Sequence, residues 1–269
     1  LARTRTYILL HGTRNSHEIQ VSISTVNGFI TMKDLEISNC DLKVVSTDSG
    51  PTVLKDVVAK CSDSGPGAND GKFCHFNNVI DITAGRGSVE LDRVVADAIA
   101  IRTQEGRVNL KEITQLNPET GITITTTKGD VRIEYLVAAG NIQIETKTGD
   151  VNISIPMCNE VPAYFGTFQI VYGDVQKPSG IFFPPAQSAT RFDLEEGDKK
   201  YVIMDDLDAA ASTGQLTGTI GCHLDKGSTA CAYANELLIN TVEGRVQVTI
   251  NEDRNICAKA IGTETGGGN

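Results

Sequence analysis

Apolar and polar residues alternate along this chain in a short unit that recurs many times. Two neighbouring copies, residues 122–133 and 142–153, match at every apolar position and share a Thr, a Gly and an Asp at an offset of 20 residues. The unit reads apolar-x-apolar-x-Thr-x-x-Gly-x-apolar-x-apolar. Six copies fit it, one with Ala in place of Thr, and their turn glycines are Gly28, Gly87, Gly106, Gly129, Gly149 and Gly244. This recurrence identifies an internal repeat.

The unit predicts two short strands joined by a corner. Alternation at period two places every second side chain on one buried face of a strand. Glycine interrupts the alternation because it adopts the positive φ that a tight turn requires. The Thr shares the buried face, where we expect its hydroxyl to bond a turn amide that would otherwise lack a partner.

Two architectures use such a unit. In an antiparallel meander each glycine marks a hairpin, whereas in a solenoid each period forms one coil. Successive copies from Ile80 onward start 19, 23 and 20 residues apart, and stacked coils must match in length whereas hairpins need not. We therefore predict an all-β parallel β-helix, or β-solenoid, with coils of about 20 residues. The extra residues of the longest step fall at 115–120, which we expect to bulge outward.

The repeat divides the chain into four predicted regions. Residues 1–156 form solenoid coils with a Cys-pinned loop near 61–74, and residues 157–232 form irregular coils or an inserted loop-rich module. Residues 233–262 form a further coil, and residues 263–269 form a Gly-rich linker or tail. Because the chain does not begin with Met and ends in glycines, we expect a processed product or a segment of a longer protein.

The Thr-x-x-Gly-x-Val-x-Ile units resemble those of the adhesin-type β-solenoid family. The similarity is best from Val79 to Ile155 and recurs from Leu237 to Ile250. It implies a right-handed solenoid that is secreted or exposed at a cell surface, and it supplies no functional residues to transfer. The Cys-bearing loops depart from the simple repeat and indicate an elaborated extracellular version.

Composition narrows the range of partners. The net charge of −10 argues against nucleic acid or an anionic membrane, because both would repel the chain. Aromatic residues make up 5% and Trp is absent, so Val, Ile, Leu and Thr are expected to fill the interior. No apolar run approaches the roughly 18 residues of a membrane span, so we predict no direct membrane insertion.

The seven cysteines bear on the compartment. Cys61 and Cys74 flank one Gly-containing loop, and Cys222 and Cys231 flank another. Loops pinned at both ends by Cys suggest disulfides and an oxidising, extracellular setting. The alternative is a cytosolic protein with seven free thiols.

The 61–74 loop also offers oxygen ligands. Asp63, Asn69 and Asp70 lie among glycines there and are weak candidates for calcium binding. The loop lacks the strict Asp-x-Asp-x-Asp-Gly spacing, so we assign no metal. We likewise predict no cofactor.

No arrangement of residues in the sequence is typical of an enzyme. The four histidines, at positions 11, 17, 75 and 223, are far apart and show no mutual spacing. Asp130 and Asp150 are expected one coil apart, where they could hold a cation. Solvated turn carboxylates balanced by Arg107 and Arg132 explain them more simply. We therefore predict no catalytic residue.

One sequon, Asn152-Ile153-Ser154, makes Asn152 a candidate for glycosylation, because alternation points its side chain outward. The leading functional hypothesis is a non-catalytic structural or adhesive module of a larger secreted or cell-surface protein, which could be a subunit of an extracellular filament whose copies join end to end or side to side. Expected partners are other copies, neighbouring domains and surface glycans. The alternatives are a carbohydrate-binding or carbohydrate-cleaving β-helix and a cytosolic scaffold.

Overall fold

The computed structural model describes residues 7–12, 19–38, 40–60, 78–158, 161–162, 166–172, 191–193, 202–204, 215–220, 235–244 and 246–251. These residues form strands and short turns, with no helix among them. The first strands are β1 (Tyr7–Gly12), β2 (Ile19–Asn27), β3 (Ile30–Ser38), β4 (Cys40–Ser49), β5 (Thr52–Lys60), β6 (Val79–Ala84) and β7 (Val89–Ala96). They continue as β8 (Ala98–Glu105), β9 (Val108–Gln115), β10 (Gly121–Lys128), β11 (Val131–Ala138), β12 (Asn141–Thr148), β13 (Val151–Cys158) and β14 (Val161–Pro162). The last are β15 (Gly166–Tyr172), β16 (Arg191–Asp193), β17 (Val202–Met204), β18 (Gln215–Ile220), β19 (Asn235–Glu243) and β20 (Val246–Asn251).

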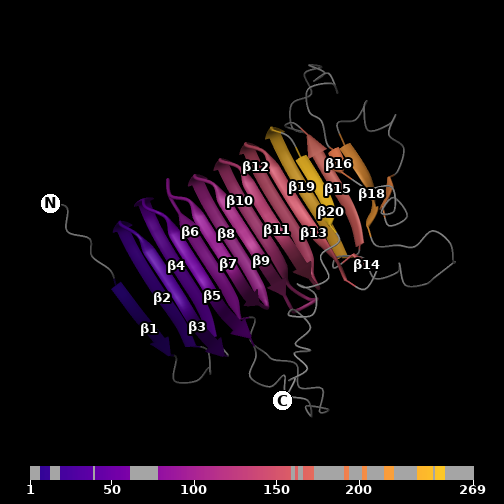
Figure 1. The fold of residues 1–269 in the computed structure, drawn as a ribbon. Helices are drawn as coiled ribbons and strands as arrows, with labels where there is room; N and C mark the ends of the chain where they lie inside the picture. Colours follow the sequence, from indigo (N-terminus) through magenta and orange to yellow (C-terminus); the bar gives the residue numbers. More distant parts are fainter. Residues whose placement is uncertain are drawn as a thin grey trace, which may run out of the picture.

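Strands alternate between two sheets as the chain proceeds (Figure 1). One sheet has the order β1-β2-β4-β6-β8-β10-β12-β19-β15-β18-β17, and the other has the order β16-β20-β13-β11-β9-β7-β5-β3. From β2 to β13, each odd-numbered strand and the even-numbered strand before it form one coil, and corresponding strands of successive coils pair in parallel. This confirms the predicted β-solenoid and excludes the antiparallel meander.

The strand register reproduces the repeat. Ile122 pairs with Ile142 on one side and with Ile99 on the other, as the unit requires. The structure adds one coil that the pattern missed, formed by β4 and β5 between the first and second predicted copies. In that coil Ser46 replaces the Thr, Thr52 replaces an apolar residue, and the turn before Gly50 is one residue longer.

Aliphatic side chains stacked in rows fill the space between the sheets. Ile80, Ile99, Ile122, Ile142 and Leu237 form one such row, and each is at most 1% exposed. β-Branched and aliphatic side chains pack well on a pleated surface, so the predicted interior is confirmed.

The Thr of the repeat is buried, but its predicted hydrogen bond is wrong. The hydroxyls of Thr126, Thr146 and Thr241 have no hydrogen-bond partner among the described residues. Thr103 donates to the carbonyl oxygen of Gly85 at 3.3 Å rather than accepting from an amide. The Thr therefore acts mainly as a small β-branched side chain that fills the corner of the core.

The repeat glycines form a continuous column of backbone contacts along one edge of the solenoid. A Cβ added at Gly129 would lie 2.1 Å from the carbonyl oxygen of Gly106, and one added at Gly149 would lie 2.2 Å from that of Gly129. The same contact links every repeat glycine from Gly50 to Gly244 to the glycine of the preceding coil. Positive φ is expected at all six glycines of the predicted repeat. It occurs at Gly129, Gly149 and Gly244 but not at Gly28, Gly87 or Gly106. Close approach of backbones is therefore the shared requirement.

At two places, strands that lie side by side in the stack are separated by a long stretch of sequence, and the same kind of hydrogen bond joins them. The step from Asp41 to Val79 spans 38 residues, and the carboxylate of Asp41 accepts the Val79 N–H at 3.0 Å. The step from Asn141 to Glu236 spans 95 residues, and the amide oxygen of Asn141 accepts the Glu236 N–H at 2.9 Å. Both acceptors occupy the same position at the start of their coil. At both of these steps, therefore, a side chain of one coil bonds the first residues of the strand that stacks on it.

The bulge predicted at 115–120 is organised by a buried amide. Gln115 is 1% exposed. Its Nε2 donates to the carbonyl oxygen of Asp97 at 2.7 Å, and its Oε1 accepts the N–H groups of Ala139 and Gly140 at 3.0 and 2.7 Å. One side chain therefore joins three consecutive coils.

Replacing Gly129 with Ala tests the glycine column. We expect Gly129→Ala to lower the free energy of unfolding by more than about 2 kcal/mol, because the new Cβ overlaps a backbone oxygen and a positive φ is strained for Ala. Chemical denaturation measures the loss. Lys128→Ala, in the same turn with an exposed side chain, is the control and should stay within about 0.5 kcal/mol of the parent. Equal effects at both positions would contradict the column.

Replacing Gln115 with Ala tests the buried amide. We expect a loss of about 2 kcal/mol, because the Gly140 N–H loses its partner in a site closed to water. The Ala139 N–H keeps the backbone carbonyl oxygen of residue 115, and the Asp97 carbonyl oxygen keeps the Thr120 hydroxyl. The exposed Gln104→Ala, on β8, is the matched control and should change the unfolding free energy by no more than about 0.5 kcal/mol. A Gln115→Ala protein as stable as the control would show that the network is dispensable.

Candidate functional site

A second set of stacked residues forms a column of backbone bends along the sheet that contains β3, β5, β7, β9 and β11. Among the described residues, five that are not glycine have positive φ, between 53° and 60°: Asp34, Asp56, Arg93, Glu112 and Tyr135. Each lies midway along its strand, between paired residues; for example, Lys111 pairs with Glu134 before the bend and Ile113 pairs with Leu136 after it. The bend shifts the alternation by one residue, so the buried positions are Val131 and Ile133 before it and Leu136 and Ala138 after it. Such strained residues persist only where their surroundings hold them in place.

The column of bends stops at β13. Ile155 stands where the register would place the next bend, and it has no positive φ, which a β-branched side chain strongly disfavours. β13 instead stays extended and keeps its alternation, burying Val151, Ile153 and Ile155. It pairs with β20 at six positions, through Pro156.

A bent strand beside a straight one must separate from it. β11 pairs with β9 at seven positions but with β13 at only three, from Val131 to Ile133. Beyond Ile133 the two strands part on the outer surface of the sheet, at the positions of Glu134 and Ser154. The absence of one bend therefore creates a gap in an otherwise regular sheet.

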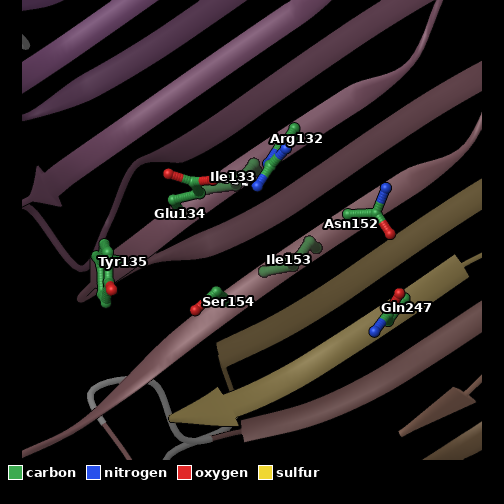
Figure 2. Close-up of a pocket in the computed structure, with 8 residues that line it drawn as sticks. All are labelled: Arg132, Ile133, Glu134, Tyr135, Asn152, Ile153, Ser154 and Gln247. Atoms are coloured by element: carbon green, nitrogen blue, oxygen red, sulfur yellow. Dashed lines mark ion pairs between the residues drawn. The ribbon is translucent and has the colours of Figure 1, made fainter. Parts of the chain in front are cut away.

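A pocket of about 450 Å³ lies on the outer face of the sheet, over the last paired positions of β11 and β13 and the start of this gap. It is lined by Arg132, Ile133, Glu134, Tyr135, Asn152, Ile153, Ser154 and Gln247. Figure 2 shows the lining residues on three neighbouring strands, with Arg132 and Glu134 on β11, Asn152 and Ser154 on β13, and Gln247 on β20. Tyr135, the last residue of the bend column, stands at one side of the pocket. We call this site the β11–β13 pocket.

The β11–β13 pocket is polar but carries balanced charge. The guanidinium of Arg132 lies 2.5 Å from a carboxylate oxygen of Glu134, and the two side chains are 64% and 34% exposed. The remaining polar lining consists of a phenol, a hydroxyl and two amides, at Tyr135, Ser154, Asn152 and Gln247. The site therefore offers donors, acceptors and one aromatic ring without a net charge from its lining.

The bend column leading to the pocket carries ion pairs. Arg93 binds both carboxylate oxygens of Asp56, at 2.5 and 2.9 Å, and Lys55 lies 3.1 Å from Asp92. The hydrogen bond from Arg93 lowers the pKa of Asp56 below its usual value and raises the pKa of Arg93. These pairs link β5 to β7 across the bend.

Only some of the sequence-predicted residues lie within the described structure. Asn152, the glycosylation candidate, lines the β11–β13 pocket and is half-buried; its glycosylation stays a prediction. Asp130 accepts the Asp150 N–H at 3.1 Å and lies 3.7 Å from Arg107, which supports the turn interpretation over a cation site. The calcium candidates Asp63, Asn69 and Asp70 and the disulfide candidates Cys61, Cys74, Cys222 and Cys231 lie outside the described residues.

The described residues contain no group of three or more His, Cys, Asp or Glu side chains placed to hold a metal ion. Within the same residues there is no helix of the length and hydrophobicity needed to cross a membrane.

Sequence reasoning missed the β11–β13 pocket. The repeat unit ends two residues before the bend, so the repeat pattern does not include the bend positions. Aligning them sets Asp34, Asp56, Arg93, Glu112 and Tyr135 against Ile155. The change to a β-branched residue followed by Pro was the available signal.

The stacked parallel coils place this chain among the β-solenoid proteins. Residues 4–191, well over half of the chain, match the Toastrack DUF4097 family, and the chain belongs to that family. The resemblance expected from the repeat is therefore supported at the level of a β-solenoid family. No curated protein and no solved structure matches the chain significantly.

The Asp56–Arg93 pair predicts a pH dependence. Because the pKa of Asp56 is lowered in the folded protein, the pair contributes stability above the unfolded pKa of about 4, and that contribution is lost as the pH falls through the lower folded value. Arg93→Met should therefore be less stable than the parent at pH 7, with the difference shrinking at pH 3 and below. Denaturant unfolding across this range measures it. Arg107→Met, which breaks a longer and more exposed pair, should cost less at pH 7; a pH-independent Arg93→Met deficit would refute the assignment.

Proposed function

We propose that this chain is a non-catalytic structural or adhesive module of a larger secreted or cell-surface protein. The observation that carries the proposal is the constancy of the strand register across the two long steps of 38 and 95 residues. Coils on either side of each step stack as though nothing intervened, and the acceptors Asp41 and Asn141 lie at the same point of the coil. A scaffold that carries additional segments on a fixed core requires this property.

The composition of the interior indicates that any recognition takes place on the outer surface of the module. The described core is a continuous aliphatic cluster from Ile30 to Val248, and its buried polar network around Gln115 has a structural role. Any recognition by this module therefore takes place on its outer faces or on the segments that interrupt the coils. Among the described residues, the β11–β13 pocket is the candidate.

The extracellular setting is supported by the sequence. Cysteines bracket two Gly-containing loops, at 61–74 and 222–231, as in disulfide-pinned loops of secreted proteins. The partners that fit such a module are other copies of the chain, neighbouring domains of the same protein and surface glycans. Self-association into a filament belongs to the same proposal.

The proposal predicts oxidised cysteines and retention on surfaces. In native material we expect Cys61, Cys74, Cys222 and Cys231 to resist alkylation until reductant is added, as mass spectrometry of the peptides would show. The immobilised chain should retain intact cells, whereas the same chain unfolded before immobilisation should not. Seven freely alkylated thiols in native protein would favour the cytosolic scaffold instead. Electron micrographs showing only compact monomers at every concentration would remove the filament.

A further inference from the structure

We propose that the β11–β13 pocket binds an uncharged saccharide, one or two sugar rings in size. The assignment of such a ligand to an adhesive role rests on the proposed function, whereas the site itself stands on the geometry of β11, β13 and β20. The backbone fixes the pocket, its side chains suit hydroxyl groups, and its charge and shape disfavour other ligands.

The backbone fixes the pocket. β11 is held by seven paired positions with β9, and β13 by six with β20, so both walls belong to continuous ladders. They cannot close on each other, because Tyr135 turns β11 whereas Ile155, fully buried, keeps β13 straight. A site formed by two rigid strands loses little freedom when a ligand binds.

The lining side chains suit a polyol. Each sugar hydroxyl both donates and accepts, and the carboxamide of Asn152 presents a donor and an acceptor side by side. Arg132 adds donors and Glu134 adds acceptors, and their pairing orients both groups. Tyr135 offers an apolar ring face with a polar tip, which matches the C–H face of a sugar ring. Ser154 and Gln247 already form interactions within the protein, so the proposal does not depend on them.

Size and charge select among ligands. A pocket of about 450 Å³ falls within the range of small-ligand sites. Because Arg132 and Glu134 neutralise each other, neither a uronate nor a sugar phosphate gains a counter-charge from the lining. Neutral sugars should therefore bind better than charged ones.

An extended peptide is the competing class of ligand. Strand addition needs a continuous row of free backbone groups along an edge. At this gap the row is short and interrupted. The backbone groups of β11 up to Ile133 already pair with β13, and the strand bends at Tyr135. The geometry thus favours a compact ligand over a strand.

Saturation-transfer NMR on the full chain tests the site. The chain is produced in a host that does not glycosylate sequons, so that Asn152 carries no glycan. The probes are glucose, galactose, mannose, N-acetylglucosamine and their common disaccharides, with glucuronate and glucose 6-phosphate as charged comparisons. We expect millimolar or tighter binding of at least one neutral sugar and weaker binding of both charged analogues.

Two variants have matched controls one or two coils away. Tyr135→Asn removes the ring while keeping a residue that tolerates positive φ, and Glu112→Asn makes the same change at the preceding bend. Asn152→Ala removes the amide, and Asn109→Ala does so in the same outward row but outside the pocket. We expect each pocket variant to weaken binding about tenfold and each control to leave it unchanged. Unchanged melting temperatures confirm that all four variants are folded.

Several results would overturn the assignment. They are the absence of neutral-sugar binding, binding insensitive to both Tyr135→Asn and Asn152→Ala, a preference for the charged analogues, or displacement of a bound sugar by extended peptides. If sugars fail to bind but the chain still retains cells and keeps its cysteines oxidised, only the site is wrong. If sugars bind but all seven thiols are free in native material, the extracellular setting is wrong and the site stands.

Discussion

Each coil of this solenoid rests on the one before it through a glycine whose α-carbon lies against a backbone oxygen of the preceding glycine. From Gly50 to Gly244, an added Cβ would come within 1.9–2.2 Å of that oxygen. No side chain fits there, so glycine at this position lets successive coils approach to the spacing that the parallel hydrogen-bonded ladders require. The aliphatic rows stack at the same spacing, coil upon coil. Even the coil that follows the 95-residue step must supply a glycine at the same place, and it does so with Gly244.

The glycine column and the bend column impose different requirements on the residues that form them. At the glycine edge any larger residue collides with backbone, so the position tolerates no change. At the bend in the other sheet the requirement is a positive φ, which Asp, Arg, Glu and Tyr all meet at some cost in strain. A bend can therefore be lost without breaking the stack, as happens at Ile155. The pocket arises beside the bend column, where the fold allows variation.

The sequence predicted the repeat, its strands and its stacked architecture, because alternation and the Thr-x-x-Gly corner depend on neighbouring residues. It did not reveal the β4–β5 coil, in which Ser46 and Thr52 weaken the pattern. It also assigned positive φ to glycines such as Gly87 and Gly106, whose real constraint is a contact with another coil. The β11–β13 pocket depends on how Tyr135 and Ile155 compare across coils. Such a comparison requires the register, which only the structure supplies.

The order of coils in space differs from their order along the chain. β19 lies between β12 and β15, so the last coil in the sequence is inserted before strands that precede it (Figure 1). Beyond β15 the sheet continues with the antiparallel strands β18 and β17, and at the other end the antiparallel β1 covers β2. An antiparallel strand changes the hydrogen-bond pattern offered to a further coil, so continuing the parallel stack past β2 would require β1 to leave. Association of copies through the sides of the solenoid requires no such rearrangement, and it is the arrangement more compatible with these ends.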